Sequence, residues 1–198
     1  MKYLALGDSY TIGEQVDYNL NFPSQTTRLL QQQGIPVVLD KLTATTGWTT
    51  DELATALAND PPTHDYDWVT LLIGVNNQYR GRSTEEYHWQ FYSLLCQSIL
   101  YAQGRADRVI VLSIPDWGLT PFNTDRDRIS TSQEIDAYNL INKRLAEQLH
   151  THYIDVTSST RAHASDPHFL APDMLHYAAP EYALWAQQVA SIILTHCS

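Results

Sequence analysis

Trp68-Val69-Thr70-Leu71-Leu72-Ile73 is the stretch that decides the fold. Apolar side chains occupy nearly every position of this run, rather than every second one, as in a strand that is buried on both faces of a sheet. Val109-Ile110-Val111-Leu112 has the same character. Strands covered on both faces are typical of parallel sheets, so these two runs predict an α/β protein.

Candidate strands and helices alternate along the rest of the chain. We expect strands at residues 2–7, 37–42, 68–73, 109–114 and 153–156, and helices at 23–33, 50–57, 84–103, 132–150 and 180–194. This alternation implies right-handed crossovers, which place helices on both faces of the sheet. The stretches 115–128 and 157–179 are expected to be irregular, and long loops of this kind are often functional.

Composition limits the class of protein. The 198 residues suffice for a single domain, covering 1–198, with a sizeable core. A net charge of −10 and a pI near 5.0 argue against a nucleic-acid partner, which would need a basic face. No apolar run is long enough for a membrane span, and Gly7-Asp8 comes too early for a signal peptide. We therefore expect a cytoplasmic protein, and a monomer as the simplest assembly.

Groups capable of chemistry follow four of the expected strands and precede the last helix. The segments are Gly7-Asp8-Ser9-Tyr10, Thr45-Thr46-Gly47-Trp48, Gly74-Val75-Asn76-Asn77, Pro115-Asp116-Trp117-Gly118 and Asp173-Met174-Leu175-His176. Parallel strands end at the same edge of a sheet, so the first four segments fall on one edge. The fifth reaches that edge if its loop folds back.

Ser9 and His176 are a candidate nucleophile and base. A serine hydroxyl is a poor nucleophile until a base takes its proton, and histidine is the natural base near neutral pH. Asp173, three residues before His176, is close enough to orient one ring nitrogen. The same spacing is also typical of a turn or a helix cap, and the chain has seven other histidines.

Acyl transfer also requires hydrogen-bond donors for a developing oxyanion. The candidates are the backbone N–H groups of Ser9 and Gly47 and the side-chain amide of Asn76. No side chain would block the approach of a substrate to the N–H of Gly47. Taken singly, Gly47 and Asn76 are equally typical of turns.

Other chemistries have less support. The chain lacks a Gly-x-Ser-x-Gly elbow, a Walker A motif and a Gly-x-Gly-x-x-Gly motif. A receiver-like phosphotransfer domain would use Asp8, but no paired acidic residues stand beside it to hold Mg²⁺. A set of titratable residues near the C-terminus matches no standard metal-ligand spacing. The set is His163, Asp166, His168, Asp173 and His176.

Together, the segments resemble the SGNH hydrolases, also called the GDSL lipase/esterase family. That family is named for Ser, Gly, Asn and His in four sequence blocks, and Ser9, Gly47, Asn76 and His176 stand in this order. The resemblance implies a flavodoxin-like three-layer α/β/α sandwich with a five-strand parallel sheet. It also implies a triad of Ser9, His176 and Asp173, with Ser9, Gly47 and Asn76 as the oxyanion hole, and no metal or cofactor.

Three positions depart from the family pattern. Tyr10 stands where Leu is usual, and Tyr177 follows the histidine where Pro is common. Asn77 replaces the Asp that often follows the asparagine, so we expect that loop to lack carboxylate support. None of these changes removes a group that does chemistry.

The expected function is that of a serine esterase that acts on a small-molecule ester through an acyl-enzyme on Ser9. Aromatic residues on the expected loops are candidates for substrate contact or for loop packing. They are Trp48, Tyr79, Trp117, Phe122 and Tyr177. No lid-like apolar helix is evident, which favours short-chain acyl or acetyl esters, including those of carbohydrates. The alternatives are a lysophospholipase or thioesterase, and a non-catalytic ligand-binding module on the same fold.

Overall fold

The sheet places β1 and β3 side by side. The computed structural model describes residues 1–197, and within that range five parallel strands pair in the order β2-β1-β3-β4-β5. They are β1 (Lys2–Gly7), β2 (Val38–Ala44), β3 (Trp68–Leu72), β4 (Val109–Leu112) and β5 (His152–Ile154). The chain passes from β1 outward to β2 and then returns to β3, so the strand order reverses between β1 and β3. Ligands bind in open parallel sheets at such a reversal, beyond the carboxyl ends of the strands.

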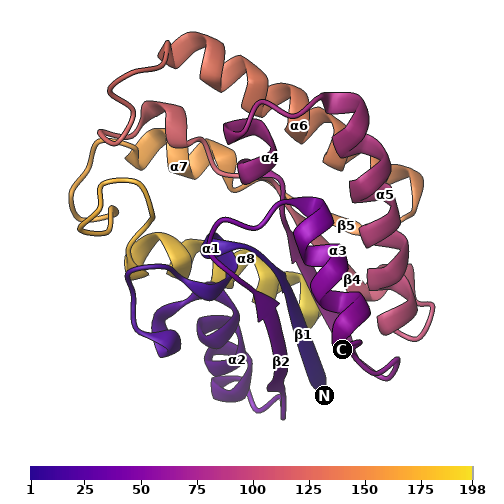
Figure 1. Cartoon of the computed structure of the whole chain (residues 1–198). Helices are drawn as coiled ribbons and strands as arrows, with labels where there is room; N and C mark the ends of the chain where they lie inside the picture. The colour runs from indigo at the N-terminus through magenta and orange to yellow at the C-terminus, as the bar shows by residue number, and fades with distance from the viewer. Residues whose placement is uncertain (198) are drawn as a thin grey trace.

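Helices cover both faces of the sheet and complete the predicted three-layer α/β/α sandwich (Figure 1). On one face α2 (Phe22–Gln32) packs against α8 (Ala179–Thr195). The other face carries α3 (Thr50–Asn59), α5 (Thr84–Tyr101) and α6 (Arg128–Gln148). Every residue of β3 and β4 is buried, which confirms the prediction from their continuous apolar runs. Among residues 1–197, no helix combines the length and the apolar character needed to cross a membrane.

The sequence pattern predicts none of the three short helices that follow strands. α1 (Ser9–Ile12) comes directly after Asp8, α4 (Val75–Tyr79) follows Gly74, and α7 (Thr157–His163) lies in a stretch expected to be irregular. Each is too short to display a helical period in its apolar residues. Short 3₁₀ turns occur at Tyr18–Leu20, Ala106–Arg108 and Trp117–Leu119.

The first turn of α6 lies earlier than predicted. The helix begins at Arg128 rather than at residue 132, because the Asp127 side chain caps it by accepting the Ser130 N–H at 2.8 Å. Ile129 in this turn is 71% exposed and does not continue the apolar stripe. The apolar period therefore identifies the body of the helix, whereas the cap determines where it starts.

Asp8 is a buried carboxyl group at the end of β1. Its Oδ1 caps α1 by accepting the Tyr10 N–H at 3.0 Å, and its Oδ2 has no partner within residues 1–197. The side chain is fully buried. Burial raises the pKa of Asp8 to about 7, because the charged form loses its hydration.

Asp8→Asn should change the way stability depends on pH. The pKa of Asp8 in the folded chain lies above the ordinary value of 3.8, so the folded chain binds this proton more tightly than the unfolded chain. The Asp8 contribution to the free energy of unfolding therefore falls as the pH rises from about 4 to about 7 and stays low above that range. The Asn variant keeps the acceptor for Tyr10 and has no proton to lose. Relative to the wild type it should gain up to about 4 kcal/mol across this range, measured by urea unfolding at a series of pH values.

Asp17→Asn is the matched control for this measurement. Asp17 is an exposed carboxyl whose side chain makes no capping hydrogen bond. The control should follow the wild type at every pH. A stability difference between Asp8→Asn and the wild type that does not vary with pH would contradict the assignment.

Candidate active site

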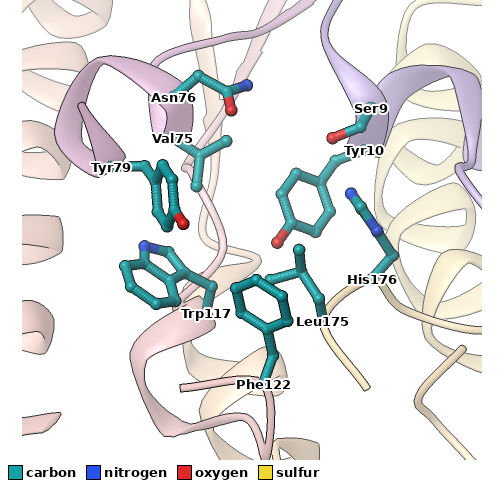
Figure 2. Close-up of a pocket in the computed structure, with 9 residues that line it drawn as sticks. All are labelled: Ser9, Tyr10, Val75, Asn76, Tyr79, Trp117, Phe122, Leu175 and His176. Carbon is teal, nitrogen blue, oxygen red and sulfur yellow. The ribbon is translucent and has the colours of Figure 1, made fainter. Parts of the chain in front are cut away.

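A cavity lies beyond the carboxyl ends of β1 and β3, where the strand order reverses. Its volume is about 180 Å³. Ser9 and His176 lie on one side of it, and Tyr79 and Trp117 lie on the other (Figure 2). Four of the five predicted segments supply lining residues, and the segment 45–48 does not. The lining consists of Ser9, Tyr10, Val75, Asn76, Tyr79, Trp117, Phe122, Leu175 and His176.

Ser9 is the first residue of α1, directly beyond β1. The close approach of α1 to the sheet requires a glycine at position 7. A Cβ atom on Gly7 would lie 2.0 Å from Thr11 Oγ1 and 2.4 Å from the Leu72 carbonyl oxygen. Ser9 is only 3% exposed, and its hydroxyl points into the cavity (Figure 2). N–H groups in the first turn of a helix have no intrahelical acceptor, so the Ser9 N–H is suited to bind an oxyanion.

The Asp173 carboxylate orients His176. The imidazole Nδ1 lies 2.6 Å from Asp173 Oδ2, and Asp173 Oδ1 accepts the backbone N–H groups of Leu175 and His176, each at 3.0 Å. Partial burial of Asp173 acts to raise its pKa. The hydrogen bonds from the His176 ring and the two backbone N–H groups outweigh burial and hold the pKa below its ordinary value. A carboxylate that stays charged fixes Nδ1 as the donor and leaves Nε2 as the basic atom.

The turn between these two residues has an unusual backbone. Met174 has a φ of +58°, in the left-handed region that residues with side chains seldom adopt. The His176 carbonyl accepts the Ala171 N–H at 2.8 Å, and the Met174 carbonyl accepts the Phe122 N–H at 3.2 Å. Such a conformation persists where surrounding contacts determine it, and these contacts also join the turn to the loop that carries Phe122.

Ser9 and His176 are brought to the same cavity, and no hydrogen bond joins their side chains within the described part of the chain (Figure 2). The Tyr10 ring packs beside the imidazole with ring centroids 5.1 Å apart, and His176 is 7% exposed. This packing limits the directions in which the imidazole can turn. Catalytic hydrogen bonds are often long or poorly aligned without substrate and tighten when it binds.

Asn76 lies in the first turn of α4, two residues beyond Gly74. Gly74 has a φ of +132°, and a Cβ atom there would lie 2.5 Å from the Tyr87 ring, so only glycine permits this turn. The Asn76 Nδ2 donates to the Trp48 carbonyl at 3.0 Å. An amide nitrogen has two N–H bonds, which leaves the second for a ligand, and this nitrogen points toward the Ser9 side of the cavity (Figure 2).

Gly47 adjoins the site without lining the cavity. Its carbonyl accepts Arg80 Nη2 at 2.6 Å, and Arg80 Nη1 contacts Glu52 at 3.1 Å. The bond between Asn76 and the carbonyl of Trp48, the next residue, ties this loop to α4. The structure therefore brings Asn76 into the cavity lining and leaves Gly47 behind it.

Asn77 supports this loop through its side-chain amide. Its Oδ1 accepts the Thr50 N–H at 3.0 Å, and its Nδ2 donates to Thr50 Oγ1 at 2.7 Å. The sequence predicts a loop without support from a carboxylate. The Asn77 amide supports the loop instead, through these two hydrogen bonds. It connects α4 to the start of α3, next to the segment that carries Gly47.

Three of the five predicted aromatic residues line the cavity, namely Tyr79, Trp117 and Phe122. The other two do not line it, and both fit the alternative of packing within the protein. Trp48 is half-buried and packs against the core. Tyr177 is fully buried, and its hydroxyl donates to a backbone carbonyl of α7. Position next to a candidate catalytic residue in the chain does not ensure that a side chain faces the same cavity.

Buried hydrogen bonds fix the orientation of Trp117. Its Nε1 donates to Gln78 Oε1 at 2.7 Å, and Gln78 Nε2 donates to Glu134 Oε2 at 2.6 Å. Asp116, the preceding residue, is fully buried and accepts Arg161 Nε at 2.8 Å. Buried polar groups are stable only when they are paired, so this network holds the indole in one position.

Sequence reasoning missed three lining residues, Tyr10, Val75 and Leu175. Each lies within a predicted segment, directly beside or between the candidate site residues, and this adjacency is the signal that could have identified them. Gln78, which anchors Trp117, was also missed, because a polar residue in a short helix carries no pattern of its own.

The titratable residues considered as metal ligands take other partners. His163 pairs with the buried Glu181 at 2.6 Å, and Asp173 pairs with His176. No group of three or more His, Cys, Asp or Glu side chains among residues 1–197 is arranged to hold a metal ion.

Comparisons with known proteins agree with this fold. The chain resembles the lipase/acylhydrolase from Enterococcus faecalis, with a TM-score of 0.74, 18% identity and coverage of 97% of this chain and 94% of that chain. It also resembles the acetyl xylan esterase AlAXEase, with a TM-score of 0.76, 17% identity and coverage of 96% and 98%. For a variant of Axe2, an acetyl xylan esterase from Geobacillus stearothermophilus, the TM-score is 0.71 at 21% identity, with coverage of 97% and 94%.

Structural likeness at these identities shows the fold alone, and no curated protein matches the chain. The family itself is shown by the sequence. The model of the GDSL-like lipase/acylhydrolase family matches residues 5–184, which is most of the chain. The chain therefore belongs to the GDSL-like lipase/acylhydrolase family of ester-bond hydrolases.

Proposed function

We propose that this protein is a serine esterase that forms an acyl-enzyme on Ser9 and acts on short-chain acyl esters. The observation that carries the proposal is the meeting of Ser9 with the hydrogen-bonded Asp173–His176 pair at one small cavity. Acetyl esters of carbohydrates fall within this class, in keeping with the acetyl xylan esterases among the similar structures.

In the first half of the reaction, Ser9 Oγ attacks the ester carbonyl carbon and His176 Nε2 takes the hydroxyl proton. Asp173 stabilises the imidazolium that forms. The oxyanion accepts hydrogen bonds from the Ser9 N–H and the Asn76 amide, because both residues line the cavity. Gly47, the third donor predicted from the sequence, lies outside that lining. Each such donor typically contributes about 2.7–4 kcal/mol to transition-state stabilisation. The bond to the alcohol oxygen then breaks, and His176 gives its proton to the departing alcohol.

In the second half, water attacks the acyl carbon while His176 Nε2 takes one of its protons. The second tetrahedral intermediate collapses, the bond to Ser9 Oγ breaks, and His176 returns a proton to the serine. The carboxylic acid leaves, and the chain is restored. The Nδ1 bond to Asp173 keeps the ring in the same tautomer in both halves.

The cavity favours a small acyl group. Its volume of about 180 Å³ lies below the range of roughly 300–1,000 Å³ that is usual for ligand pockets. Val75 and Leu175 give it apolar walls, and the aromatic side chains close its far side (Figure 2). An acetyl or similarly short acyl chain suits these walls, whereas a long chain would have to displace them.

Ser9→Ala should abolish both hydrolysis and covalent labelling. A fluorophosphonate probe is expected to label the wild type on Ser9, and intact mass measurement reports the adduct. The Ala variant has no nucleophile, so kcat for p-nitrophenyl acetate should fall by about 10⁴-fold or more, with no adduct.

Ser93→Ala is the matched control for this experiment, because Ser93 is exposed on α5 and is not among the residues that line the cavity. It should label and hydrolyse like the wild type. Hydrolysis by Ser9→Ala at the wild-type rate would overturn the assignment of Ser9 as the nucleophile. A wild type that shows no hydrolysis and no labelling would favour a non-catalytic binding module.

Acyl-chain preference tests the size of the cavity. Among p-nitrophenyl esters, kcat/KM should be highest for acetate and about tenfold or more lower for octanoate. Phe122 is 41% exposed, so Phe122→Ala enlarges the cavity without removing a buried side chain. This variant should shift the preference toward longer chains.

Trp89→Ala removes an aromatic side chain that is 63% exposed on α5 and should leave the preference unchanged. A wild-type kcat/KM that is highest for octanoate would contradict the short-chain assignment and favour a lysophospholipase or thioesterase.

A further inference from the structure

A second hollow borders the catalytic cavity across the aromatic wall of Tyr79, Trp117 and Phe122, which lines both. Its volume is about 250 Å³. Residues 123–126 complete its lining, which is therefore more polar than that of the catalytic cavity. None of the proposed reaction steps involves this hollow.

The Arg126 guanidinium lies against this wall. Its guanidinium carbon lies 4.6 Å from the Tyr79 ring centroid and 5.3 Å from that of Trp117. Its Nη2 donates to the Tyr79 carbonyl at 2.7 Å, and its backbone N–H donates to Asn123 Oδ1 at 3.0 Å. No carboxylate within residues 1–197 forms an ion pair with Arg126, so its remaining N–H groups are available to a ligand.

An acceptor stands beside this donor. Asp125 also lines the hollow, and its Oδ1 accepts the Thr124 hydroxyl at 3.0 Å, which leaves Oδ2 for a ligand. The hollow therefore combines aromatic surfaces, a planar charged donor and a carboxylate acceptor. An alkyl chain placed there would desolvate both charged groups and offer them no hydrogen bonds.

We propose that this hollow binds the alcohol part of the ester and that this part is a polyhydroxylated ring of the carbohydrate type. The proposal rests on the proposed function, in which the acyl group occupies the neighbouring apolar cavity. The C–H face of such a ring packs against the aromatic wall, and its hydroxyl groups donate to Asp125 and accept from Arg126. These two residues are thus assigned to substrate recognition and not to the chemical steps.

The test measures binding rather than turnover. The Ser9→Ala chain is titrated with unacetylated xylotriose, cellotriose and maltotriose, and saturation-transfer NMR with indole fluorescence reports binding. At least one saccharide should bind and change the indole fluorescence. Asp125→Asn and Arg126→Gln, each made in the Ser9→Ala chain, should weaken that binding by about tenfold, as expected for the loss of one charge-assisted hydrogen bond.

Arg128→Gln is the matched control, because Arg128 is exposed two residues beyond Arg126 and does not line the hollow. It should bind as tightly as the parent. Absence of binding by all three saccharides, or equal weakening by Arg128→Gln, overturns the proposed subsite. Saccharide binding by a chain whose wild type hydrolyses no ester would uphold the subsite and reject the esterase proposal, so the two failures are distinguishable.

Discussion

The parallel pairing of β1 with β3 is the constraint on which the rest of the structure depends. Gly7 at the end of β1 lies in register with Leu72 at the end of β3, so the two strands finish side by side. Ser9 and Asn76 each follow within a few residues, and segments far apart in the chain therefore share one edge. Burial of both strands by helices on either face stabilises this arrangement.

The other half of the site is built from loop hydrogen bonds rather than strand pairing. The Asp173 carboxylate holds the turn through two backbone N–H groups and the imidazole through Nδ1, so one side chain both shapes the loop and orients the His176 ring. The Phe122 N–H bond to this turn and the Gln78 bond to Trp117 connect it to the aromatic wall. A site made of loops is thus fixed by paired polar groups that are buried or partly buried.

Local sequence patterns predict the strands and the candidate site residues, whereas the directions of side chains depend on three-dimensional geometry. The continuous apolar runs identify the strands, and residues of the ordered blocks such as Ser9 and His176 do meet at one cavity. The sequence does not predict which of these side chains face the cavity. Leu175 faces the cavity whereas Tyr177 is buried, although both follow closely on a turn with a left-handed backbone at Met174. No apolar period encodes such a turn, which arises from tertiary contacts.

The central claim is that Ser9 carries the acyl group during turnover. Rapid acid quenching of the wild type with excess p-nitrophenyl acetate, followed by peptide mass spectrometry, tests it most directly. The account predicts an acetyl group on the Ser9 hydroxyl in the first turnover, which disappears once the substrate is exhausted. Hydrolysis of the ester with no acetyl group on Ser9, or with a transient acetyl group on another residue, would contradict it.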